Sequence, residues 1–176
     1  MSEVFRLDLP LEDKTIFARL KAFDRVSLNG SLLVARDQAH KRLCRLLADG
    51  LPLPVRLEGE MVYYMGPSPA PEGFPIGACG PTTSARMDPF APMLLDLGLA
   101  GMVGKGPRSR DVVDAIVRNG AIYLQAYGGC GALYASTVRA VETVAFPELG
   151  PEALLRLQIE DFPALVAIDS HGDGVY

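Results

Sequence analysis

Segment 80–88, with the sequence GPTTSARMD, holds the residues whose types and spacing are best suited to chemistry. A Gly-Pro pair forces a turn, and three consecutive hydroxyl residues after it are typical of a helix N-cap. Arg86 follows Thr82 by four residues, so a helix starting here would place both side chains on one face. Free backbone N–H groups, hydroxyls and a guanidinium together can bind a small carboxylate or phosphate. The alternative is an ordinary capped surface helix with a solvated arginine.

Two further candidates lie where a predicted strand meets a predicted helix. Arg36 stands between a strand over 32–35 and a helix over 37–49, and such junctions are where α/β folds bind ligands. The alternative for Arg36 is a solvated side chain next to Asp37. His40 lies one turn into that helix, where it could carry a proton or orient a neighbour; a lone helical histidine is more commonly structural.

Lys105 follows an apolar strand, inside the sequence Gly-Lys-Gly. This run fails the phosphate-loop pattern, which needs glycine at the Leu99 position and serine or threonine at the Gly106 position. The flanking glycines nevertheless leave the ammonium accessible to a ligand. Nearby Arg108 and Arg110 are interpreted as a surface charge cluster.

The composition describes a globular chain without a general affinity for polyanions. It has 176 residues, of which 49% are hydrophobic and 22% charged, and its net charge is -4. These values fit one domain over 1–176 and give no reason to expect nucleic acid or an anionic membrane as a partner. No apolar run approaches a membrane span, and the N-terminus lacks a signal-peptide pattern, so the expected location is cytoplasmic.

The cysteines do not predict a metal site. Cys44, Cys79 and Cys130 are an odd number without a C-x-x-C pair, which disfavours a disulfide framework. Three thiolates could in principle hold an iron–sulfur cluster with one open iron, but cluster ligands usually include a close pair. Asp169, His171 and Asp173 fit a polar turn after a strand better than a metal-ligand set. We therefore expect no metal ligand in this chain.

Apolar strands alternating with helices predict an α/β domain with a mixed sheet. Asn29-Gly30, between two strand-like stretches, signals a hairpin or a bulge. The expected helices are 13–21, 37–49, 92–97 and 109–119, with a helix or turn over 152–157. The expected strands are 4–9, 25–28, 31–34, 61–65, 101–104, 121–126 and 165–168, with a further helix and strand before Val144.

Four candidate groups, Arg36, Thr82, Arg86 and Lys105, stand at predicted element ends, and three cations in one pocket would suit a substrate with two carboxylates. The motifs that carry them occur in a recognisable order: ARDQAH over 35–40, GPTTSARM over 80–87, GKG over 104–106 and PELG over 147–150. This pattern resembles the β subunit, or equivalent C-terminal domain, of class I iron–sulfur fumarases and the related L(+)-tartrate dehydratases. The resemblance runs from about Val4 to the last residues.

The resemblance implies a swivelling β/β/α domain, with a mixed sheet flanked by helices, that closes over a [4Fe-4S] cluster. The cluster would be held by three cysteines of a partner α subunit and not by this chain. Arg36, Arg86 and Lys105 would bind the substrate carboxylates, and Thr82 would be the catalytic base. The residues expected to support them are Asp37, His40 and Thr83.

The implied reaction is reversible addition of water to a dicarboxylate, fumarate to malate, by a β subunit that is inactive without its α partner. The closest alternative is the β subunit of an L(+)-tartrate dehydratase. An alternative of another class is a non-catalytic module that binds an anion or a protein partner. The isolated chain could self-associate as a homodimer.

Overall fold

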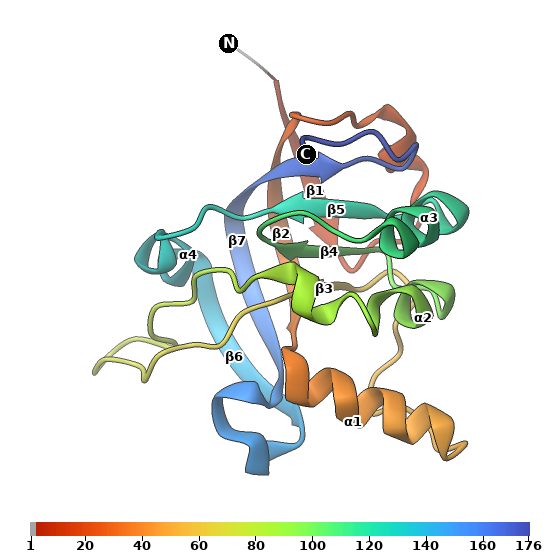
Figure 1. Cartoon of the computed structure of the whole chain (residues 1–176). Helices are drawn as coiled ribbons and strands as arrows, with labels where there is room; N and C mark the ends of the chain where they lie inside the picture. Colours follow the sequence, from red (N-terminus) through yellow and green to blue (C-terminus); the bar gives the residue numbers. More distant parts are fainter. Residues whose placement is uncertain (1–2) are drawn as a thin grey trace.

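A closed ring of five strands forms the centre of the computed structural model, which describes residues 3–176 (Figure 1). Neighbouring strands β2 to β5 are parallel, and β7 closes the ring by pairing antiparallel with both β5 and β2. The ring strands are β2 (Arg25–Val34), β3 (Met61–Tyr63), β4 (Gly101–Gly104), β5 (Ile122–Gln125) and β7 (Leu154–Ile168). Outside the ring, β1 (Val4–Leu9) pairs parallel with β2, and β6 (Val138–Ala145) pairs antiparallel with β7.

Helices surround this ring. Figure 1 shows α2 packed beside α3, with α1 near them and α4 across the molecule. The α-helices are α1 (Asp37–Ala48), α2 (Ala91–Asp96), α3 (Arg110–Asn119) and α4 (Gly131–Thr137). Residues 3–176 also contain three short 3-10 helices: η1 (Thr15–Arg19), η2 (Ser84–Met87) and η3 (Pro147–Glu152). No helix in residues 3–176 is long and apolar enough to cross a membrane.

Alternating residues of the ring strands supply two separate apolar cores. In β2, Leu32 and Val34 face one core and Leu33 faces the other, and in β5 Leu124 and Tyr123 divide in the same way. Successive side chains of a strand point to opposite faces, so both faces of the ring are covered. One core lies under α1, α2 and α3, and the other fills the interior of the ring. This double burial fixes the strand ends that carry the candidate residues.

The structure confirms the predicted mixed α/β architecture with flanking helices and corrects two local expectations. The strands predicted over 25–28 and 31–34 are one strand, because β2 continues through Asn29-Gly30; the bulge alternative for this pair is confirmed, with a bulge against β7 between Leu28 and Gly30. Gly30 has φ +95°, and a Cβ there would lie 2.2 Å from the Leu9 carbonyl oxygen. The helix or turn predicted over 152–157 is wrong, because β7 begins at Leu154. The expected strand 165–168 is only the end of this 15-residue strand.

Candidate functional site

The predicted site residues gather at the carboxyl ends of β2, β3 and β4. Arg36 lies two residues after β2, and Lys105 directly follows β4. Segment 80–88 crosses the same edge, because the backbone N–H of Thr82 bonds to the carbonyl of Tyr64, directly after β3. Since these strands are parallel neighbours, their carboxyl ends meet at one edge of the sheet.

Segment 80–88 is held by backbone bonds to strand ends and is not an N-capped α-helix. Pro81 forms an isolated bridge with Met65, and Thr83 forms one with Lys105. The Thr82 N–H donates to the Tyr64 carbonyl at 2.7 Å. The prediction of a hydroxyl-capped helix is wrong: η2 is a short 3-10 helix whose N-cap side chain makes no capping hydrogen bond. Instead, the carbonyls of Tyr64 and Lys105, directly after β3 and β4, accept hydrogen bonds from the backbone N–H groups of this segment.

Arg86 and Asp37 join segment 80–88 to the first residue of α1. The Arg86 Nε donates to Asp37 Oδ1 at 3.1 Å, and Nη2 donates to Oδ2. This hydrogen bonding from Arg86 lowers the pKa of the Asp37 carboxyl below its ordinary value. Asp37 therefore binds Arg86 rather than Arg36, while the Arg86 side chain stays half exposed. Within residues 3–176 the remaining N–H groups of Arg86 have no hydrogen-bond partner, so they can donate to a further acceptor.

Arg36 is fixed between a carboxylate and a glycine. Its Nε and Nη2 each lie 3.3 Å from Glu152 Oε1, just before β7. A Cβ at Gly66 would lie only 2.5 Å from Arg36 Nη1. The absence of a side chain at Gly66, in the loop that follows β3, thus leaves the space that the guanidinium fills.

The His40 side chain is hydrogen-bonded to the backbone of Arg36. Its Nδ1 lies 2.7 Å from the Arg36 carbonyl oxygen, and its ring packs against Tyr64 and Phe90. Burial lowers the pKa of His40 to about 4, so the imidazole is neutral near pH 7 and Nδ1 donates to that carbonyl. Its Nε2 is buried without a partner among residues 3–176. This geometry favours a supporting role for His40 over proton transfer to a ligand.

Lys105 is tied to segment 80–88 through its backbone, and its side chain lies beside a glycine turn. Its N–H donates to Ser84 Oγ at 3.1 Å, and the Ser84 N–H donates to its carbonyl at 2.9 Å. A Cβ at Gly128, beyond β5, would lie 4.0 Å from Lys105 Nζ. Within residues 3–176 this ammonium makes no ion pair or hydrogen bond at Nζ. It is the unpaired cation of the site.

Arg108 is buried, and the interpretation of Arg108 as part of a surface charge cluster is wrong. Its side chain is 0% exposed and its Nε donates to Asp88 Oδ1 at 2.7 Å. Its guanidinium lies 5.3 Å from the ring centre of Tyr64 and 4.9 Å from that of Tyr123. Arg110 is exposed as expected. The sequence signal that could have revealed this burial was Tyr64 and Tyr123, which lie inside the predicted apolar strands 61–65 and 121–126. A buried tyrosine hydroxyl needs a polar partner.

The thiols of this chain do not fit a site for an iron–sulfur cluster. In the described part of the chain, no three histidine, cysteine or acidic side chains are grouped to hold a metal ion. Cys79 is fully buried, and burial raises the pKa of its thiol to about 12. Cys44 lies on α1 and Cys130 directly precedes α4, so the thiols belong to different elements.

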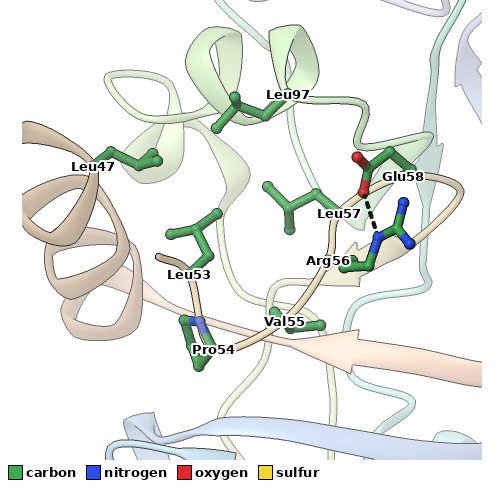
Figure 2. A pocket seen from close by; sticks show the side chains of 8 residues that line it. All are labelled: Leu47, Leu53, Pro54, Val55, Arg56, Leu57, Glu58 and Leu97. Atoms are coloured by element: carbon green, nitrogen blue, oxygen red, sulfur yellow. Dashed lines mark ion pairs between the residues drawn. The ribbon is translucent and has the colours of Figure 1, made fainter. Parts of the chain in front are cut away.

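A groove at the amino ends of β3 and β4 has different chemistry (Figure 2). Its volume is about 380 Å³, and leucine, valine and proline side chains form most of its lining, including Leu53 and Leu97. Its two charged residues, Arg56 and Glu58, pair with each other at 3.5 Å. The groove therefore offers no free cation to a dicarboxylate, unlike the opposite edge.

Comparison with known proteins agrees with the motif pattern. The family model described as "Fumarase C-terminus" matches residues 2–176. "Fumarate hydratase class I, anaerobic" of Escherichia coli is 38% identical over 179 residues, covering 99% of this chain and 33% of the relative. "Fumarate hydratase 2" of Leishmania major is 41% identical over 154 residues, covering 86% of this chain and 27% of the relative. This chain thus spans about a third of the length of these fumarate hydratases.

A relative of similar length also matches. "Putative L(+)-tartrate dehydratase subunit beta" of Methanocaldococcus jannaschii is 38% identical over 164 residues, covering 90% of this chain and 84% of the relative. A family match over almost the whole sequence, together with this relative, settles the classification. The chain with three cations at the carboxyl ends of its parallel strands belongs to the fumarase C-terminus family.

Proposed function

We propose that this chain is the β subunit of an iron–sulfur hydro-lyase that reversibly hydrates fumarate to malate. The observation that carries the proposal is the convergence of Arg36, Arg86 and Lys105 at one strand edge, in a chain of this family. A separate α subunit would carry the [4Fe-4S] cluster, which agrees with the unsuitable thiols of this chain. We propose no metal ligand among the residues of this chain.

The charge balance of the edge suits a substrate with two carboxylates. Asp37 pairs with Arg86 and Glu152 pairs with Arg36, while the Lys105 ammonium has no partner in the described chain. Three cations against two carboxylates leave one positive charge in excess. Guanidinium groups bind carboxylates in a planar, two-pronged geometry, and each retains N–H donors beyond those used for its acidic partner. We infer that the arginines hold the substrate carboxylates and that Lys105 adds the uncompensated charge.

Thr82 is the proposed group that moves the proton on the carbon next to a substrate carboxylate. Its backbone is fixed by Tyr64, and its side chain is half-buried at the same edge as the cations. An unperturbed hydroxyl is a poor base, so the nearby positive charges must stabilise its deprotonated form. The same charges would stabilise the negative charge that develops on the substrate. Asp37, His40 and Thr83 would keep this edge in place.

The dependence on a partner is proposed from the relatives. The fumarate hydratases are about three times as long as the matched region, whereas the tartrate dehydratase relative is named as a separate subunit beta. We infer that the α subunit supplies the rest of the active site and that this chain alone is inactive. A cytoplasmic location and self-association of the isolated chain stay predictions.

Anaerobic reconstitution tests this proposal. A candidate α subunit with three cluster-binding cysteines is combined with this chain, and turnover of malate and of L-tartrate is measured. We expect malate turnover by the complex only, and a colourless β chain before mixing. Turnover of tartrate but not malate would contradict the fumarate assignment. Arg86→Ala should lower activity about 100-fold through loss of a charged contact, and unchanged activity would overturn the site assignment.

The second candidate is the β subunit of an L(+)-tartrate dehydratase. The relative of Methanocaldococcus jannaschii favours it, because this chain covers 84% of that protein. The two substrates differ by one hydroxyl group, so both fit a pocket that binds two carboxylates. The same paired assay decides between them.

A further inference from the structure

A buried polar network lies directly beneath the cationic edge, which is the edge of the sheet that carries Arg36, Arg86 and Lys105. The Arg108 guanidinium is enclosed by the rings of Tyr64 and Tyr123 and donates to Asp88. The second Asp88 oxygen accepts the Ser109 N–H at 2.7 Å. The Arg108 side chain is 0% exposed, so its guanidinium cannot contact a substrate itself. Its charge is compensated inside the protein, by the last residue of segment 80–88.

The same network reaches the backbone of Lys105. The Tyr123 hydroxyl lies 2.9 Å from Ser84 Oγ and 2.8 Å from the Gly106 carbonyl. Because a hydroxyl has one proton, Tyr123 donates to Gly106 and accepts from Ser84. Ser84 Oγ in turn accepts the Lys105 N–H. The backbone of Lys105 and of the next residue, Gly106, is therefore hydrogen-bonded to this buried network.

The network leaves little room for adjustment. A Cβ at Gly104 would lie 1.9 Å from Ser84 Oγ and 3.0 Å from a ring carbon of Tyr64. The Tyr64 carbonyl also accepts the Thr82 N–H, so one residue contacts Arg108 and holds the proposed base. A shift of the Arg108 side chain would therefore be passed to both parts of the edge.

We propose that Arg108 is a positioning residue that sets the spacing between the Lys105 ammonium and segment 80–88, which carries Thr82 and Arg86. This inference rests on the proposed function for its catalytic consequence. Loss of Arg108 would leave every substrate-binding cation present but would loosen their relative placement. Small displacements of binding groups are sufficient to weaken binding and turnover.

Hydrogen exchange of the full-length chain tests the network without any assay of activity. The variant is Arg108→Gln, and Arg110→Gln is the matched control, because Arg110 is exposed and undergoes the same change in charge. We expect exchange at the Ser84 and Lys105 amides to rise at least about tenfold in R108Q and to stay unchanged in R110Q. Equal protection of both amides in R108Q and the wild type would overturn the proposal.

A double variant separates positioning from folding. Arg108→Gln alone leaves Asp88 as a largely buried carboxylate without its cation, whereas Asp88→Asn with Arg108→Gln removes both charges. We expect the double variant to recover thermal stability but to keep the fast exchange at Ser84 and Lys105. Recovery of amide protection together with stability would show a merely structural role and overturn the proposal.

Kinetics of the reconstituted complex give the catalytic readout. R108Q and the double variant should raise the KM for malate about tenfold, while R110Q leaves it unchanged. An unchanged KM in the well-folded double variant would contradict the positioning role. Failure of the wild-type complex to convert malate or tartrate would instead contradict the proposed function, and the exchange experiment would then decide the Arg108 proposal alone.

Discussion

The two ends of the parallel strands carry loops of opposite character. At the carboxyl ends, Arg36, Arg86 and Lys105 converge; backbone bonds connect Lys105 to segment 80–88, and the Arg86–Asp37 pair connects that segment to α1. At the amino ends of β3 and β4, an apolar groove contains one exposed ion pair between Arg56 and Glu58. Both edges belong to the same ring of strands. The difference shows that the ring supplies position, whereas the loops supply the chemistry.

The two ends also differ in what holds them. Hydrogen bonds and three ion pairs, Arg36–Glu152, Arg86–Asp37 and Arg108–Asp88, fix the carboxyl edge, so a small change in geometry there should alter ligand binding. Packing of side chains such as Leu53 and Leu97 forms the groove, so a change there should alter stability alone. Four substitutions test this contrast, from the largest expected effect to the smallest.

Thr82→Ala should have the largest effect at the carboxyl edge. If Thr82 transfers the proton, kcat of the reconstituted complex should fall about 10²- to 10⁴-fold, with little change in KM. Thr82→Ser retains a hydroxyl and should recover most of this loss. Steady-state kinetics with malate provide the measurement. Wild-type kcat in the alanine variant would assign the base to another residue.

His40→Leu should remove an acid sensitivity from the layer beneath Arg36. The pKa of His40 is lowered from 6.5 to about 4 by burial, so between these pH values the unfolded chain binds a proton that the folded chain does not. The contribution of His40 to stability is therefore fully present above pH 6.5, and about 3 kcal/mol of it is lost as the pH drops to about 4.

Urea unfolding of the chain at pH 7 and pH 4.5 measures this dependence. His40→Leu should flatten the change in unfolding free energy, although loss of the bond to the Arg36 carbonyl lowers stability at pH 7. His171→Leu is the matched control because that histidine is exposed. The same steep pH dependence in His40→Leu and the wild type would exclude His40 as its cause.

Gly66→Ala should impair binding without unfolding the chain. Its Cβ would lie 2.5 Å from Arg36 Nη1, the far end of a flexible side chain, so Arg36 must move. We expect the KM for malate to rise about tenfold with an almost unchanged melting temperature. Gly128→Ala is the control, because its Cβ would make an ordinary 3.8 Å contact with Lys105 Cδ. An equal KM in both variants would show that the position of Arg36 does not affect substrate binding.

Leu97→Ser in the groove should have the smallest effect. Leu97 is 41% exposed, so its loss should cost about 1 kcal/mol of stability. The kinetic constants of the reconstituted complex should not change. Denaturant unfolding and malate turnover check the two parts of this prediction. A large fall in turnover would mean that the amino end contributes to function and would remove the contrast between the ends.

The sequence was sufficient to predict the elements whose stability is local. The strand over 101–104 is confirmed, and the helix predicted over 37–49 ends one residue earlier than expected, because apolar runs and helical spacing are properties of neighbouring residues. The long strand β7 was not predicted as one element. Its middle contains Pro163 and Asp161, which has φ +53°, and its Asp161 N–H is satisfied by the Asn29 side chain, far away in sequence.

The candidate site was predictable in its position but not in its contacts. Arg36, Lys105 and segment 80–88 could be placed at element ends from sequence, and parallel strand order then brings those ends together. The conformation of segment 80–88 depends on carbonyls of Tyr64 and Lys105, which local patterns do not reveal. The burial of Arg108 likewise depends on two rings far apart in sequence, Tyr64 directly after β3 and Tyr123 on β5.

The pairing of β7 has a consequence for the newly made chain. β7 follows the other strands in sequence, yet it pairs along all of β2 and also with β5 and β6. Until this segment leaves the ribosome, β2 and β5 each expose an unpaired edge, and unpaired edges are where strands of other chains add. Ring closure is a late, long-range step, so a stalled or truncated chain would be prone to aggregate.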